Sequence, residues 1–236
     1  MEKKRQWLLT TTLFISLGLA ACGSQSVLSQ AEANTQTTTK TSTTSTTQTA
    51  SYFEASDLTT TYDESKASKI SLQGTTATVS GDGVTVNGST VEITKAGTYI
   101  VEGTASKVQL KVAAGKEDEV QIVFKNATLK NTKAPLLVDT AKKVILTIAD
   151  GTKNEVADES TSTVKGAIYS DSDLTINGKG SLTVTGAASN AIKSKDGIRI
   201  VDATVTTTAK KHGVAANDFV NVSGATLNLS ADEDGI

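Results

Sequence analysis

The chain has 236 residues, of which 37% are hydrophobic and 20% are charged, so one domain with a sizeable apolar core can form. Its 23 basic and 25 acidic residues give a formal net charge of −2, which offers no basic excess for a nucleic-acid partner. One cysteine and one histidine leave little for a disulfide framework, a zinc site or a catalytic triad.

Residues 1–21 have the pattern of an export signal. Three basic residues at positions 3–5 precede an apolar run at 7–19, which is short for a membrane span and ends in small residues. The junction LAAC ends at Cys22 and looks like a bacterial lipobox; the alternative is an ordinary signal peptide with a chance cysteine. By resemblance to lipoproteins, Cys22 would carry diacylglycerol, and two acyl chains suffice for stable anchoring to the extracellular face of the cell membrane.

A tether is predicted next, over residues 22–50. The stretch NTQTTTKTSTTSTTQTA at 34–50 has almost no apolar side chains, so it cannot bury enough surface to offset the entropy of ordering. We interpret it as a disordered Ser/Thr-rich spacer that holds a folded domain off the membrane.

From Ser51 onward the pattern is that of an all-β protein. Short segments alternate at period two, are rich in Val, Ile, Thr and Leu, and are bounded by Gly, Asn and Asp; examples are TVEIT at 90–94, VQIVF at 120–124 and VILTI at 144–148. The segment 70–112 resembles antiparallel strands, so residues 51–115 are expected to form an N-terminal β cap with the first coils.

A ten-residue phrase recurs in the second half of the chain, as AIYSDSDLTI, AIKSKDGIRI and GVAANDFVNV. Its aliphatic anchors Ile168, Ile192, Val214 and Ile236 are separated by 24, 22 and 22 residues. The longer first unit is accommodated by insertions at surface turns near 177–180 and 186–188. A period in this range indicates stacked structural repeats.

Each unit of about 22 residues offers three short strands. In register, the anchors are followed by further aliphatic groups, namely Leu174, Ile198 and Val220; Ile176, Ile200 and Val222; and Leu182, Val205 and Leu227. One coil cannot bury its own apolar face, but coils stacked about 4.8 Å apart bury a continuous column. Residues 116–236 are therefore predicted to form a parallel β-helix; the alternative is a β-sandwich of hairpins, which explains the fixed period less well.

The ordered part of the chain, from about Tyr52 to Ile236, resembles the bacterial family of carbohydrate-binding domain-containing proteins. The resemblance rests on SDLTTTYDES (56–65), VSGDGVTVNGSTVEITKAGTYIVEGT (79–104), ADGTKNEV (149–156), GAIYSDSDLTINGKGSLTVTG (166–186) and AIKSKDGIRI. It implies a right-handed parallel β-helix that binds acidic polysaccharide such as polygalacturonate, with calcium in the fold and no established catalysis.

Two departures from the family pattern stand out. Where the family tends to carry Asp before Gly-Val or Ala-Ile, as at Asp234, this chain has Asn190 and His212, which weakens any acidic ladder there. The sequence also stops at Ile236 as another coil begins, which suggests truncation; a chain that ends there is expected to have a frayed or aggregation-prone last coil.

Calcium would be held by carboxylates on successive turns, since hard cations prefer several oxygen ligands. Asp196 and Asp218 each lie four residues after an anchor and share a column, so they are the best pair for one ion. The full candidate set is Asp171, Asp173, Asp196, Asp218, Asp232 and Asp234; the alternative is that these are ordinary turn residues.

An acidic polymer would be bound by outward cations. Tyr169 follows an inward anchor and should point outward, and Lys193 shares its column; with Ile192 and Ile198 inward, Lys193 and Arg199 should point outward too. The predicted basic strip comprises Tyr169, Lys193, Lys195, Arg199, Lys210 and Lys211, which would make charge-assisted contacts with uronate carboxylates. The alternative is an ordinary solvated face.

These observations favour a surface-anchored, non-catalytic protein that binds acidic polysaccharide. A surface adhesin or structural β-helix is the alternative, since an anchor, a tether and a rigid stack suit adhesion as well. A polysaccharide lyase is less favoured: Arg199 near Asp196 could serve proton abstraction, but the coils are few and no lyase motif is visible.

Overall fold

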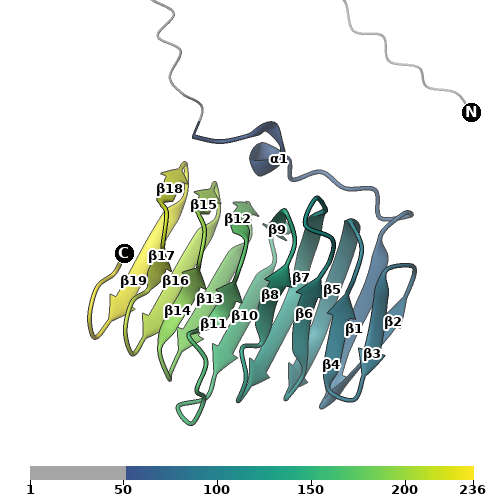
Figure 1. Cartoon of the computed structure of the whole chain (residues 1–236), viewed down its shortest axis with the longest axis horizontal. Helices are drawn as coiled ribbons and strands as arrows, with labels where there is room; N and C mark the ends of the chain where they lie inside the picture. Colours follow the sequence, from purple (N-terminus) through teal and green to yellow (C-terminus); the bar gives the residue numbers. More distant parts are fainter. Residues whose placement is uncertain (1–51) are drawn as a thin grey trace, which may run out of the picture. The chain divides into compact units, whose positions relative to one another are not determined.

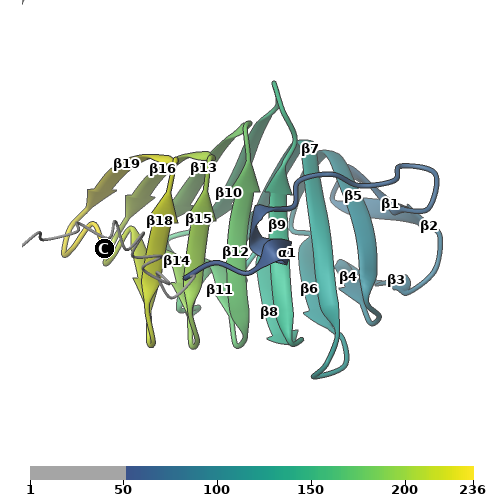
Figure 2. The ribbon, with the colours of Figure 1, turned by 90° about the horizontal axis from the view of Figure 1, so that it is seen from above.

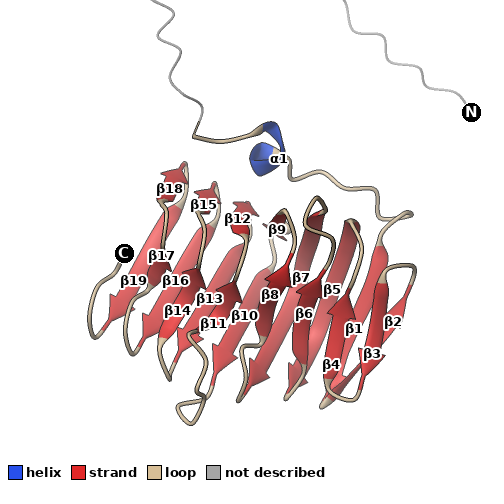
Figure 3. Cartoon of the chain, in the orientation of Figure 1, coloured by secondary structure: helices blue, strands red, loops and turns tan. Residues whose placement is uncertain are grey.

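The computed structural model describes residues 52–236, which belong to one compact unit. The predicted signal peptide, Cys22 and the tether lie outside the described residues. Within them the fold is almost entirely β, with a single short helix, α1 (Ala55–Leu58), as Figure 3 shows. No helix in this part of the chain has the length and apolarity needed to cross a bilayer.

The strands wind into six stacked coils with three faces, which confirms the predicted parallel β-helix (Figure 1). The β14 face holds β4 (Thr90–Ile93), β6 (Gln109–Ala113), β8 (Leu136–Thr140), β11 (Gly166–Ser170), β14 (Asn190–Ser194) and β17 (Val214–Ala216).

The β12 face comes next along each coil and the β13 face follows it. The β12 face holds β9 (Lys143–Ile148), β12 (Asp173–Gly178), β15 (Ile198–Val201) and β18 (Val220–Ser223). The β13 face holds β10 (Lys153–Asp158), β13 (Ser181–Gly186), β16 (Thr204–Ala209) and β19 (Thr226–Ala231). Two longer strands, β5 (Gly97–Ser106) and β7 (Glu119–Asn131), each run through both of these faces.

The repeat predicted from the sequence is the stacking register of the coils. Ile168 pairs with Ile192 and Ile192 with Val214, all in parallel strands. The register offset falls from 24 residues at Asn177 to 23 at Ser181 and to 22 at Ile192, so the first unit's two extra residues lie at the predicted turns.

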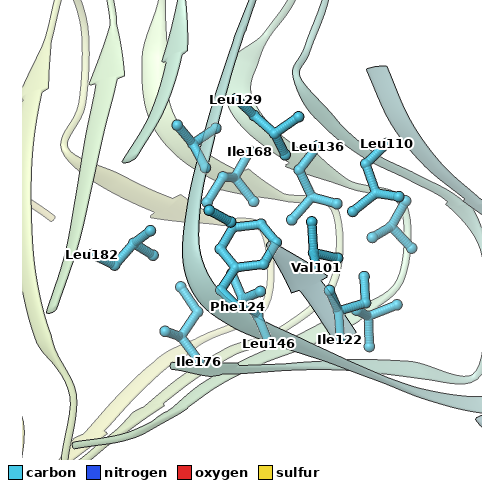
Figure 4. Close-up of a cluster of buried hydrophobic side chains, with 14 of the residues drawn as sticks. Val101, Leu110, Ile122, Phe124, Leu129, Leu136, Leu146, Ile168, Ile176 and Leu182 are labelled. Carbon is cyan, nitrogen blue, oxygen red and sulfur yellow. The ribbon is translucent and has the colours of Figure 1, made fainter. Parts of the chain in front are cut away.

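The core is a set of aliphatic columns inside the coils. Inward side chains from all three faces meet around Phe124 (Figure 4), and Leu136, Ile168 and Ile192 are fully buried. Burying one such side chain contributes roughly 1.5–3 kcal/mol. The fold is therefore stabilised by packing between neighbouring coils, without disulfides in the described residues.

The N-terminal end of the stack carries the antiparallel pairing. β1 (Ser68–Gly74) pairs with β2 (Thr76–Ser80), and β3 (Val84–Asn87) with β4. The structure differs from the sequence interpretation beyond Ile93, because β5 and β6 pair in parallel and belong to the coils. Period-two alternation reports which face is buried and is the same for both strand directions.

Candidate functional site

A short N-terminal segment, residues 52–60, lies across the outer surface of the β12 face. We call it the strap; it contains α1, which lies over β9 and β12 (Figure 2). Only Asp57 of the strap is fully buried, whereas Tyr52 and Leu58 remain 64% and 56% exposed. Phe53 is half-buried, so the one fully buried side chain that attaches the strap is the polar Asp57.

The Asp57 carboxylate is the centre of these contacts. Oδ1 accepts hydrogen bonds from Lys143 Nζ (3.0 Å) and Thr175 Oγ1 (2.5 Å), while Oδ2 accepts one from the backbone N–H of Glu54 (2.7 Å) and lies 3.3 Å from Arg199 Nε. Burial opposes ionisation, but the hydrogen bonds from Thr175, Glu54 and Lys143 outweigh it and hold the pKa of Asp57 below its usual value.

Backbone carbonyls complete the attachment of the strap. Asn177 Nδ2 donates to the carbonyl oxygens of Asp57 and Thr59, both at 2.9 Å. Arg199 Nε donates to the carbonyl of Tyr52 at 3.0 Å, and Lys143 Nζ also lies 2.8 Å from Glu54 Oε2. Three coils thus supply side chains to one covering segment.

The expectation that Arg199 lies on a solvated basic strip is wrong. Arg199 does point outward from its coil, but the strap covers it and leaves it 8% exposed. Its guanidinium lies 4.7 Å from the centre of the Phe219 ring and 3.3 Å from Asp173 Oδ2. Sequence periodicity gives the direction of a side chain but not what a distant segment places on top of it.

Tyr169, Lys193 and Lys195 do gather on the outer surface of the β14 face. Tyr169 pairs with Lys193 in register, as predicted. Lys195 Nζ lies 2.7 Å from Asp171 Oδ2, and Lys193 Nζ donates to Asn217 Oδ1 at 2.6 Å. Burial and the neighbouring Asp171 carboxylate raise the pKa of Tyr169. Asp171 thus partly neutralises Lys195, whereas Lys193 keeps its charge and is only hydrogen-bonded by the neutral Asn217 side chain.

Lys210 and Lys211 lie at the turn after β16, away from the Tyr169 group. Lys210 Nζ lies 2.6 Å from Asp232 Oδ2 on the next coil. The backbone carbonyl of Lys211 accepts from the N–H of Glu233 at 3.1 Å. The predicted strip is therefore several local pairs across two faces rather than one continuous row.

The six aspartates expected to bind calcium are also distributed. Asp173 pairs with Arg199 and accepts the N–H of Gly197, Asp171 and Asp232 pair with lysines, and Asp234 lies 3.4 Å from His212 Nδ1. Burial first, then the carboxylates of Asp173, Asp218 and Asp171, raise the pKa of Asp196. Within residues 52–236 no three acidic, His or Cys side chains converge as a metal site would require, so the six residues do not fit one calcium centre.

A groove that the sequence did not reveal lies where the strap passes the corner between the β12 and β13 faces. Its volume is about 560 Å³, within the usual range for small-ligand sites. Its walls carry ammonium groups, carboxylates, hydroxyls and one phenol, from Thr60, Tyr62, Lys125, Thr147, Asp150, Thr152, Lys179 and Asp202, and Leu58 adds an apolar side chain.

The charges along the groove are set by its surroundings. Lys125 Nζ lies 3.3 Å from Glu64 Oε1, and this carboxylate raises the pKa of Lys125. Lys179 is exposed at the turn between β12 and β13, and Tyr62 is half-buried. The groove combines an aromatic ring, hydroxyls and two lysines with the carboxylates of Asp150 and Asp202. The ring and the hydroxyls suit a sugar, and the ammonium groups suit a carboxylate on that sugar. Its residues come from five separate segments, so no local motif marks it.

Comparison with known proteins assigns the chain to a family. Residues 87–236 match the model of the carbohydrate-binding domain-containing protein family. A protein of that description from Acetivibrio thermocellus is 35% identical over 137 residues, covering 54% of this chain and 48% of its own, so this chain spans about half the length of that relative.

The fold also has a solved counterpart. The gadolinium derivative of the polysaccharide lyase-like protein from C. thermocellum superposes with a TM-score of 0.60 at 23% identity, covering 72% of this chain and 93% of that one. At this identity the likeness concerns the fold alone. The match over residues 87–236 shows that the chain belongs to the family of carbohydrate-binding domain-containing proteins, and the stacked coils agree with this.

Proposed function

We propose that the protein is a non-catalytic carbohydrate-binding protein whose ligand is an acidic polysaccharide of the polygalacturonate type. The observation that carries the proposal is the groove between the strap and the corner of the coils, where Lys125 and Lys179 accompany Tyr62 beside Asp150 and Asp202. Ammonium groups favour uronate carboxylates, and an aromatic ring offers a face to the sugar. Family membership supports the carbohydrate part of the proposal.

The test is the affinity of the purified full chain for polygalacturonate. Lys179→Glu reverses one charge of the groove and is expected to lower the affinity about tenfold, the effect of losing one charge-assisted contact. Lys133→Glu makes the same change at an exposed lysine outside the groove lining and should bind as the wild type does. Equal losses in both variants would mean that only the overall charge matters.

The same experiment separates the alternatives. A polysaccharide lyase would release unsaturated product that absorbs in the near ultraviolet, whereas a binding protein retains the polymer unchanged. An adhesin would ignore the polymer and bind a protein or cell surface. The outer Tyr169 and Lys193 offer a second place for the polymer, and Lys193→Glu tests it against Lys179→Glu.

Calcium assistance is a further part of the proposal, limited to Asp196 and Asp218. Burial first, and then the neighbouring carboxylates including Asp218, raise the pKa of Asp196, and a cation between Asp196 and Asp218 would relieve the repulsion. Calorimetric titration with calcium is expected to give one weak site in the wild type and none in Asp196→Asn. Unchanged calcium binding in that variant would place the ion elsewhere.

We also propose that the protein is anchored through a lipid on Cys22 at the extracellular face of the bacterial membrane. The basic head, apolar run and LAAC junction support this. Cys22→Ser is expected to move the protein from the membrane fraction to the medium, which immunoblotting of the two fractions measures.

A further inference from the structure

The strap covers a set of polar side chains that would by themselves form a carboxylate-binding site. Lys143 on β9, Thr175 and Asn177 on β12 and Arg199 on β15 all face outward at one place on the β12 face. We call these four residues the receptor. All four stand on paired strands of adjacent coils, so their backbones are fixed by the ladder.

The group that occupies the receptor is itself a carboxylate. Asp57 is fully buried and contacts Lys143, Thr175 and Arg199 within 3.3 Å. The rest of the strap adds limited apolar burial, because Tyr52 and Leu58 are mostly exposed and Phe53 is only half-buried. A segment held by few apolar contacts belongs to the part of a fold that opens most readily.

The strap is an incomplete partner for the receptor. Asn177 Oδ1 and Arg199 Nη1 are both buried and have no hydrogen-bond partner, although Arg199 Nη1 lies 3.3 Å from the charged Asp173 Oδ2. Leaving a buried polar atom unpaired costs about 1–3 kcal/mol. The receptor therefore has one acceptor and one donor that the strap leaves unused.

We propose that the receptor is a subsite for a uronate unit of the polysaccharide, and that Asp57 is a built-in occupant which the ligand displaces. This rests on the proposed function, since it assigns the ligand class and its regulation. A uronate supplies a carboxylate for Lys143, Thr175 and Arg199. Its hydroxyls can also donate to Asn177 Oδ1 and accept from Arg199 Nη1, which no group of the strap does.

Competition between the two carboxylates explains how the site is controlled. Asp57 is part of the chain and acts at the high effective concentration of an intramolecular partner. A single free uronate competes poorly, whereas a polymer held in the neighbouring groove presents its own carboxylates at a comparable effective concentration. The strap would thus select for polymer over monomer.

The test is the affinity of the full chain for polygalacturonate in the Asp57→Asn variant. A strap that is closed about nine-tenths of the time lowers the apparent affinity about tenfold, so its release should raise the affinity by that factor. Asp63→Asn is the matched control, because it removes the same charge from an exposed carboxylate outside the receptor. Asp57→Asn combined with Arg199→Gln should lose the gain.

A second readout follows the strap itself. Polygalacturonate is expected to speed amide hydrogen exchange at residues 54–59 of the wild type, with circular dichroism verifying that each variant keeps its fold. Binding by the wild type with equal or weaker binding by Asp57→Asn, and a strap that stays protected, would overturn the inference and make Asp57 a permanent clamp. Binding by neither protein would overturn the proposed function as well, and binding by Asp57→Asn alone would support a fully masked subsite.

Discussion

Gly178 illustrates how single residues set the corners of this fold. It is the last residue of β12 and has a φ of 104°, and a Cβ there would overlap the carbonyl oxygen of Ile148 on the preceding coil. Gly151 also has a positive φ, of 69°, but a Cβ there meets nothing within 4 Å. Both positions favour glycine because of their positive φ, but only Gly178 also lacks space for a Cβ.

Gly178→Ala should therefore destabilise the protein much more than Gly151→Ala. Each substitution carries the strain of a left-handed backbone, about 1 kcal/mol, and Gly178→Ala adds displacement of the neighbouring coil. Urea unfolding of the two variants measures the difference. Equal losses would mean that the corner adjusts freely to a methyl group.

The lowered pKa of Asp57 determines how the strap is expected to respond to pH. Its pKa in the folded chain is below the usual value of 3.8, so its ionisation stabilises the closed strap above that pH. The contribution is lost as pH falls through the lower folded pKa, when Lys143 and Arg199 face a neutral acid. Glu54, whose pKa the Lys143 hydrogen bond lowers, acts in the same direction.

We therefore expect the strap to open below about pH 4 while the coils remain folded. Hydrogen exchange at residues 54–59, measured between pH 3 and 6 and corrected for the intrinsic rate, reports this opening. In Asp57→Asn the pH dependence should be much reduced. A strap equally protected at pH 3 and pH 6 would contradict the prediction.

At the scale of the elements, stability lies in contacts between a strand and its equivalents on the adjacent coils. Ile192 on β14 is fully buried between Ile168 and Val214. Ile192→Ala should cost about 2–5 kcal/mol, since neighbours fixed by two ladders cannot collapse into the cavity. Thr183→Ala, on the exposed side of β13, should cost less than about 0.5 kcal/mol. Chemical denaturation compares them; a small loss at Ile192 would show a loosely packed column.

At the scale of the whole molecule, each coil is an interchangeable unit. Deleting residues 192–213 removes 22 residues and joins Ala191 to Val214, which then takes the place of Ile192 on Ile168. The shortened chain is expected to fold with a lower Tm. Deleting one residue fewer shifts the register by one and turns apolar side chains outward, so it should misfold. Circular dichroism and thermal melting distinguish the two; equal behaviour would contradict the stacking register.

The sequence predicts the stack well because inward columns obey two simple rules, period two along a strand and a fixed spacing between coils. Ile168, Ile192 and Val214 satisfy both rules and lie as predicted. The contacts of the strap obey neither, since Asp57 and Thr175 are 118 residues apart in the chain. The outward direction of Arg199 could be predicted, whereas its burial depends on a segment without periodicity. The groove, lined by five segments, is hidden for the same reason.

The inside and the outside of the β12 face differ in a way that matters for a linear ligand. Inward positions repeat one kind of residue, as in Ile122, Leu146, Ile176, Ile200 and Val222. The neighbouring outward column reads Gln121, Ile145, Thr175, Arg199 and Asn221, with no two alike. The inward side chains of this face thus repeat from coil to coil, whereas the outward side chains differ on every coil. Arg199 is the one charged residue among these five, so a polymer lying along this column would be held in one register by it.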